Sequence, residues 1–226
     1  MEQGIKGAAY DKYQEFKKNQ GIKVSNEDFE TKIISNIFDE DDIKLIYEAV
    51  DSIPKENIKV MEWGGLLAFH HPLPKQIIDK INIAVKRDLG DHLFLDRDYS
   101  FARYTQHTGW KNKLHPHSDI RPSQRITFDI QIKADEQWGI IVEDKTYYLE
   151  DGQALVFAGT QQTHWREKKD IQRDSVIDMI FCHLEYVNDI PYDEDQDQTL
   201  QPRQRFLCEF YDLHGDDVPY DLTETE

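Results

Sequence analysis

The sequence predicts a single, mainly β domain with flanking helices, built as an antiparallel sandwich, barrel or jelly roll. Three observations lead to this fold class. Apolar residues recur at helical spacing in the first part of the chain, up to residue 89. From residue 100 onward they alternate with polar residues instead. Short strand-like stretches then follow one another with turn residues between them, which is typical of antiparallel rather than parallel sheets.

Two amphipathic helices are predicted in the N-terminal part of the chain. Residues 39–50 open with acidic side chains suited to a helix N-terminus. Residues 74–89 have a proline near their start and are followed by Gly90, which suits the end of a helix. A third helix is expected over residues 10–18. The apolar faces of the first two helices consist of Ile43, Ile46, Ala49 and Val50, and of Ile77, Ile81, Ala84 and Val85.

Alternating residues predict the strands of the β core. The stretch RITFDIQI, residues 125–132, places isoleucine and phenylalanine on one face and Thr127, Asp129 and Gln131 on the other. Such a strand has two different surroundings, and its polar face is the one of functional interest. The remaining strand candidates are residues 101–105, 138–143, 145–149, 153–158 and 175–184.

Length and charge limit the classes of function. We expect one domain over residues 1–226: residues 1–99 supply supporting helices and strands, 100–187 the β core, and 188–226 an acidic extension of the kind that can form a lid.

The formal net charge of −17 argues against a nucleic-acid partner. The sequence contains no apolar run of membrane-spanning length and no secretory signal, so we expect a cytoplasmic protein without a membrane partner. Cys182 and Cys208 are expected to be reduced thiols.

Three residues form a candidate metal site. His117 and Asp119 stand two positions apart in LHPHSDIRPS, and in extended backbone such residues point the same way. His164 follows a predicted turn further along the chain. Two histidines and one carboxylate form the facial triad of non-haem Fe(II) oxygenases, which leaves coordination positions open for substrate and dioxygen. We therefore predict Fe(II) at His117, Asp119 and His164, with these residues as the catalytic centre.

A candidate acid-binding pair follows the third ligand. Arg173 and Ser175 stand two apart at the start of the last predicted strand, so a guanidinium and a hydroxyl can face one cavity. A guanidinium matches a carboxylate in bidentate fashion, which a lysine cannot do. The pair is therefore predicted to hold a dicarboxylate.

The order HxD, distal His and RxS resembles the Fe(II)- and 2-oxoglutarate-dependent dioxygenases, most closely their prolyl-4-hydroxylase-like branch, over roughly residues 100–186. The resemblance implies a double-stranded β-helix (jelly-roll, cupin-like) core. It implies Fe(II), 2-oxoglutarate and dioxygen as cofactor and cosubstrates, with ascorbate as an optional reductant. In this family Arg173 would pair with the far carboxylate of 2-oxoglutarate and Ser175 would assist. The implied reaction hydroxylates an unactivated C–H bond and releases succinate and CO2.

The sequence departs from the family pattern on the substrate side. Trp138 and Gly139 stand where the branch often has a Gly-Gly-x-Thr block, and the tyrosine often found shortly before HxD is missing. Tyr104, on the preceding strand, is the candidate to replace that hydroxyl in cosubstrate binding. Arg166 stands two residues beyond His164 and is predicted to face the same pocket as a substrate-binding residue.

Two classes of function follow from these patterns. In the first, the chain is a hydroxylase that acts on a small molecule, an amino acid or a peptidyl side chain such as a prolyl residue. In the second, it is a cupin-like protein that binds a metal or a small acid without turnover. A nucleic-acid demethylase is disfavoured, because the RDSVIDM stretch (residues 173–179) lacks the second arginine of the RxNxTxR block found in such enzymes.

Overall fold

The computed structural model describes residues 29–60, 65–69, 71–96, 98–106, 112–117, 119, 126–143, 145–159 and 162–186. The expected helix over residues 10–18 and the C-terminal extension over residues 188–226 lie outside these ranges. Among the described residues, no helix combines the length and the apolar character that a membrane span needs.

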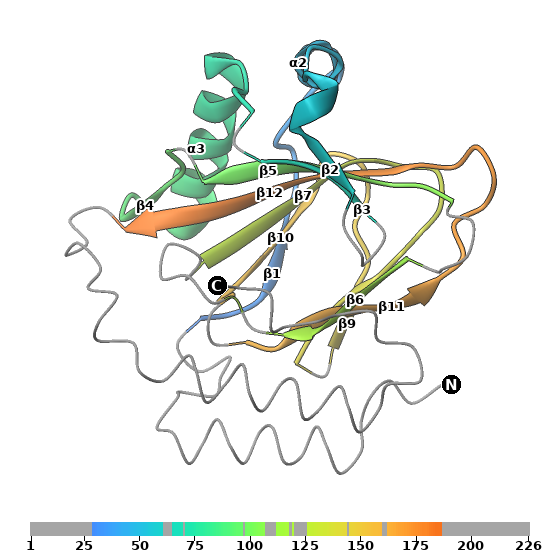
Figure 1. Cartoon of the computed structure of the whole chain (residues 1–226). Coiled ribbons are helices and arrows are strands. Elements are labelled where there is room, and N and C mark those ends of the chain that lie inside the picture. The colour runs from blue at the N-terminus through green and yellow to red at the C-terminus, as the bar shows by residue number, and fades with distance from the viewer. Residues whose placement is uncertain are drawn as a thin grey trace, which may run out of the picture.

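Two antiparallel sheets face each other (Figure 1). The larger sheet contains β1 (Lys32–Ile34), β2 (Ile58–Val60), β3 (Gly65–Phe69), β4 (Leu93–Phe94), β5 (Tyr99–Tyr104), β7 (Ile126–Ala134), β10 (Ala154–Phe157) and β12 (Ile177–Tyr186). The smaller sheet contains β6 (Asn112–His117), β8 (Ile140–Val142), β9 (Lys145–Tyr147) and β11 (His164–Lys169).

The strand order is that of a double-stranded β-helix. The larger sheet runs β1-β10-β7-β12-β5-β3-β2, with β4 paired to β12, and the smaller sheet runs β6-β11-β8-β9. From β5 onward the chain crosses between the two sheets at nearly every step, and only β8 and β9 follow each other within one sheet. The predicted fold class is therefore confirmed.

Both predicted helices are present, and they cover the face of the larger sheet that points away from the smaller one (Figure 1). Helix α2 (Glu40–Asp51) begins with a capping box, in which Asp39 accepts from the backbone of Asp42 and Asp42 accepts from the backbone of Asp39. Helix α3 (Lys75–Leu89) buries an apolar stripe that contains Ile77 and Ile81. Alternate residues of β7, from Ile126 to Ile132, pack into this same core.

The other face of the larger sheet looks toward the smaller sheet. A second apolar cluster lies between the sheets and includes Tyr104, Trp138, Leu155, Phe157 and Met179. Thr127, Asp129 and Gln131 are on this side of β7, because residues of a strand alternate between its two faces and their neighbours belong to the helix-side core. The interior between the sheets is thus partly polar, as the sequence of β7 predicts.

Two differences from the sequence-based expectation concern the candidate site. Residues 112–117, expected only as an extended connection, form strand β6, and residues 164–169 form strand β11 beside it. The last strand begins at Ile177 rather than at residue 175, so Arg173 and Ser175 precede it. Alternation of apolar and polar residues does not identify β6, because this strand is polar and contains a proline. Pairing with β11 stabilises β6 although its own residues have a low preference for strands.

Candidate metal and acid-binding site

The structure brings two of the three predicted metal ligands together. Asp119 follows β6, and its backbone N–H donates to the carbonyl of Gly159 at 2.9 Å. His164 is the first residue of β11 and is paired with His117 across the β6–β11 ladder. The Asp119 Oδ1 and His164 Nε2 atoms lie 3.7 Å apart, and both side chains are buried. The side chain of His117 lies outside the described part of the structure.

Hydrogen bonding sets the tautomer of His164. Its Nδ1 lies 3.1 Å from the backbone carbonyl of Gln162, and a carbonyl can only accept, so Nδ1 carries the proton. When the ring is neutral, the lone pair is on Nε2, the nitrogen that lies 3.7 Å from Asp119 Oδ1. A metal-bound histidine is normally held in this way, with its second nitrogen donating to a backbone carbonyl or a carboxylate. The Phe157 ring packs against the imidazole at a centroid distance of 4.6 Å.

These donors are close enough to become two neighbouring ligands of a divalent ion. Ligand atoms that each lie about 2.1 Å from one ion are about 3.0 Å apart at an octahedral angle and about 3.4 Å apart at a tetrahedral one, so the 3.7 Å between Oδ1 and Nε2 would close by a few tenths of an ångström on binding. A neutral imidazole and a carboxylate are donors that Fe(II) accepts. No group of three histidine, cysteine or acidic side chains that could hold a metal occurs among the described residues, a set that omits the side chain of His117.

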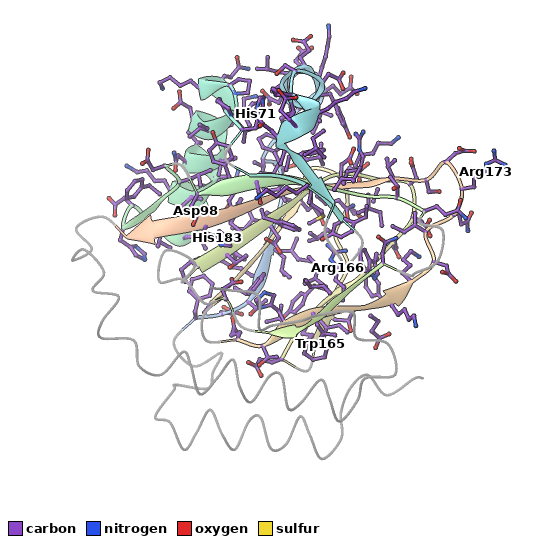
Figure 2. The ribbon with its side chains drawn as sticks, in the orientation of Figure 1. His71, Asp98, Trp165, Arg166, Arg173 and His183 are labelled. Atoms are coloured by element: carbon purple, nitrogen blue, oxygen red, sulfur yellow. The ribbon has the colours of Figure 1, made fainter. Side chains whose placement is uncertain are left out.

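Arg166 lies deep between the two sheets, two residues beyond His164 on β11 (Figure 2). Its side chain is buried, with the residue only 3% exposed. The guanidinium donates from Nη1 to the carbonyl of Trp138 at 2.7 Å and from Nη2 to the sulfur of Met179 at 3.5 Å. The predicted substrate-facing residue is thus part of the interior.

Aromatic rings surround the Arg166 guanidinium. Its central carbon lies 4.7 Å from the ring centroid of Trp138 and 5.8 Å from that of Tyr104. The two rings meet edge to face at 5.0 Å. Arginine over an aromatic face is a favourable contact, but it does not replace an anion. No carboxylate oxygen of the described residues lies within 4.0 Å of this guanidinium. Burial lowers the pKa of Arg166.

A second ionisable group, Asp129, lies on the interior face of β7. It is 8% exposed, and its Oδ1 atom is buried without a hydrogen-bond partner among the described residues. Burial, reinforced by the nearby carboxylate of Asp119, raises the pKa of Asp129 to about 8, while Arg166 acts in the opposite direction. The sequence motifs gave this residue no role. Its position on the polar face of the RITFDIQI strand was the signal that could have identified it.

Arg173 and Ser175 are not brought into this interior. The residues before β12 form a turn in which Ser175 N–H donates to the carbonyl of Gln172. The side chain of Arg173 is 87% exposed and points away from the sheets (Figure 2). This differs from the expectation that the pair faces the cavity. The cause is that strand β12 begins only at Ile177. Arg173 and Ser175 precede the strand, so the alternation of its side chains does not determine which way these two residues point.

Comparison with solved structures shows the fold. A 2OG-Fe(II) oxygenase family oxidoreductase from Burkholderia pseudomallei aligns with a TM-score of 0.51 at 12% identity, over 81% of this chain and 92% of that one. A prolyl-4-hydroxylase from Pseudomonas putida aligns with a TM-score of 0.50 at 13% identity, over 70% and 93%. EctD from S. alaskensis, solved with 2-oxoglutarate and 5-hydroxyectoine, gives 0.53 at 11% identity, over 74% and 76%.

No protein-family model and no curated protein sequence matches the chain. The chain therefore has the double-stranded β-helix fold of the 2-oxoglutarate and Fe(II) oxygenases, and this assignment rests on structure at low sequence identity.

Proposed function

We propose that this chain is an Fe(II)- and 2-oxoglutarate-dependent oxygenase whose acid-binding residue is Arg166. The observation that carries the proposal is the buried guanidinium of Arg166, which has no carboxylate oxygen of the described residues within 4.0 Å and lies in the same interior as Asp119 and His164. Buried charges in proteins are normally paired, because an uncompensated charge in a dry interior is costly. An interior that contains such a cation is suited to an anionic ligand.

His117, Asp119 and His164 are the residues that would hold the iron. The backbone pairing of His117 with His164, and the separation of Asp119 Oδ1 and His164 Nε2, support this set. Two protein residues fix the donors before any metal arrives: Gly159 accepts from the Asp119 backbone, and Gln162 accepts from His164.

Arg166 would take the role that the sequence pattern suggested for Arg173. It would pair with the far carboxylate of 2-oxoglutarate, while Tyr104 and Trp138 enclose the guanidinium and keep water from it. Excluding water strengthens the charge-assisted hydrogen bonds on which such an anchor depends. Tyr104 keeps its proposed place in the cosubstrate pocket, whereas Ser175 and Arg173 have no part in it.

Bound Fe(II) and 2-oxoglutarate supply the oxidative chemistry, in which dioxygen is consumed and the cosubstrate leaves as succinate and CO2. We propose hydroxylation of an unactivated C–H bond in a small molecule, an amino acid or a peptidyl side chain. The fold neighbours described as a prolyl-4-hydroxylase and as EctD with 5-hydroxyectoine support these substrate classes.

Binding of 2-oxoglutarate to the protein loaded with Mn(II), measured by calorimetry, tests the anchor. Arg166→Met should weaken this binding at least tenfold, because charge-assisted hydrogen bonds contribute about 1.5–3 kcal/mol each and 1.4 kcal/mol is a factor of ten. Arg166→Lys should restore only part of the affinity. Arg173→Met is the matched control, since it makes the same change at an exposed position, and it should bind normally.

Two results would contradict the proposal. If Arg173→Met lost 2-oxoglutarate binding while a folded Arg166→Met kept it, the anchor would be at Arg173. If the wild-type protein bound 2-oxoglutarate but formed no succinate with Fe(II) and oxygen, the cupin-like alternative, binding without turnover, would be favoured.

A further inference from the structure

The two oxygens of the Asp119 carboxylate have different surroundings. Oδ1 lies on the side of His164 Nε2, at 3.7 Å. Oδ2 accepts a hydrogen bond from the Thr127 hydroxyl at 2.6 Å. A distance this short is typical of a hydroxyl that donates to an ionised carboxylate. The bond is buried, since Thr127 is 3% exposed and Asp119 is 9% exposed.

Thr127 is held in place by the larger sheet, independently of the backbone at Asp119. It lies on β7, where its backbone is in register with Phe157 of β10 on one side and His183 of β12 on the other. A central strand fixes the backbone position, and a β-branched side chain has few rotamers available. The hydroxyl is therefore presented to Asp119 from a rigid support.

His183 lies on the other side of the Thr127 hydroxyl. Its Nδ1 atom lies 3.5 Å from Thr127 Oγ1, at the outer limit of a hydrogen bond. A threonine hydroxyl has one proton, and that proton is used toward Asp119. Any bond between Thr127 and His183 must then run from the imidazole to the hydroxyl oxygen, which leaves the donor role toward Asp119 undisturbed.

We propose that Thr127 is a positioning residue for the metal site: its hydroxyl holds Oδ2 of Asp119 so that the carboxylate presents Oδ1 alone toward the position shared with His164. This inference rests on the proposed function, because it takes Asp119 and His164 as metal ligands. Without the hydroxyl, the carboxylate loses a short contact that sets its terminal torsion, so Oδ1 is held less firmly toward that position. Outer-sphere partners of this kind typically change metal affinity by about 10–100-fold.

Cobalt(II) binding tests the inference, because this ion both reports affinity and has visible absorption bands that depend on its coordination geometry. Thr127→Val keeps the shape of the side chain and removes the hydroxyl, and Thr127→Ser keeps the hydroxyl. We expect Thr127→Val to weaken Co(II) binding at least tenfold and to alter the absorption bands. Thr127→Ser should restore both most of the way. Thermal unfolding of each metal-free variant shows whether the fold is intact.

The outcomes separate this inference from the proposed function. A folded Thr127→Val protein that binds Co(II) with wild-type affinity and an unchanged spectrum overturns the positioning role alone. A loss of affinity that Thr127→Ser does not restore also overturns it, because the hydroxyl would then not be the cause. If wild type and Asp119→Ala bind Co(II) equally, or neither binds it, the metal site itself is wrong and the positioning role falls with it.

Discussion

Replacing Asp129 with asparagine should change how the stability of the protein depends on pH. Asparagine has nearly the shape of the protonated acid and carries no charge at any pH. Asp129 is 8% exposed, and burial with the neighbouring Asp119 carboxylate raises its pKa to about 8. In the unfolded chain the same group should titrate near the ordinary aspartate value of about 3.9.

The sign of the effect follows from proton counting. Between about pH 4 and pH 8 the folded protein keeps a proton on Asp129 that the unfolded chain has released, so the free energy of unfolding falls as pH rises. One group with one proton can contribute at most about 1.4 kcal/mol per pH unit. Below both pKa values this cost is absent, and above both it is constant. Asp129→Asn removes the contribution altogether.

Urea unfolding of the metal-free protein, without 2-oxoglutarate, measures this difference. The free energy of unfolding of Asp129→Asn minus that of wild type should rise steadily from about pH 5 to about pH 8, by on the order of 1 kcal/mol per unit. Taking the difference cancels the other titrating groups that the two proteins share. A difference that is independent of pH would refute the reasoning and would mean that Asp129 is ionised in the folded protein throughout this range.

Two further predictions concern the scaffold around the site. Arg103 pairs with both oxygens of buried Asp178, at 2.7 and 2.8 Å, so Arg103→Ala should lower the free energy of unfolding by about 3–5 kcal/mol, whereas Asp178→Asn should cost less because it leaves no buried carboxylate. Equal losses in urea unfolding would contradict this asymmetry. Gly139→Ala would place a methyl group 2.6 Å from Cγ2 of Thr146 and should cost about 1–3 kcal/mol, measured by thermal unfolding. An unchanged melting temperature would show that β9 moves aside at no cost.

Much of the fold could be predicted from the sequence, because its signals are local. The two helices, Glu40–Asp51 and Lys75–Leu89, lie within one residue of the predicted bounds. The alternation in RITFDIQI correctly separated an apolar face, now packed under the helices, from a polar face toward the interior. Strands β1 to β4, β6 and β11 were not predicted in this way. Strands β1, β2 and β4 have only two or three residues, β3 lacks an alternating pattern, and β6 and β11 are polar, so these strands are stabilised by their neighbours in the sheets.

The same distinction between local signals and tertiary contacts applies to the candidate site. The HxD pair and His164 followed from residue type and spacing, and the structure brings Asp119 and His164 together while the His117 side chain remains a prediction. Spacing alone could not choose between Arg166 and Arg173, because both stand where an alternating pattern allows them to face inward. In the folded structure, residue Arg166 is 3% exposed, whereas the side chain of Arg173 is 87% exposed. Only the tertiary structure shows this difference.

The sequence by itself determined the fold class and the residue types of a metal site, since strand alternation and donor identity are properties of short stretches of chain. Tertiary structure decided which charges are buried together. Asp129, Arg166 and the Thr127–Asp119 hydrogen bond come from β7, β11 and the end of β6, and these segments meet only when the two sheets pack. Burial of a charge depends on everything that surrounds it, so no local pattern can predict it.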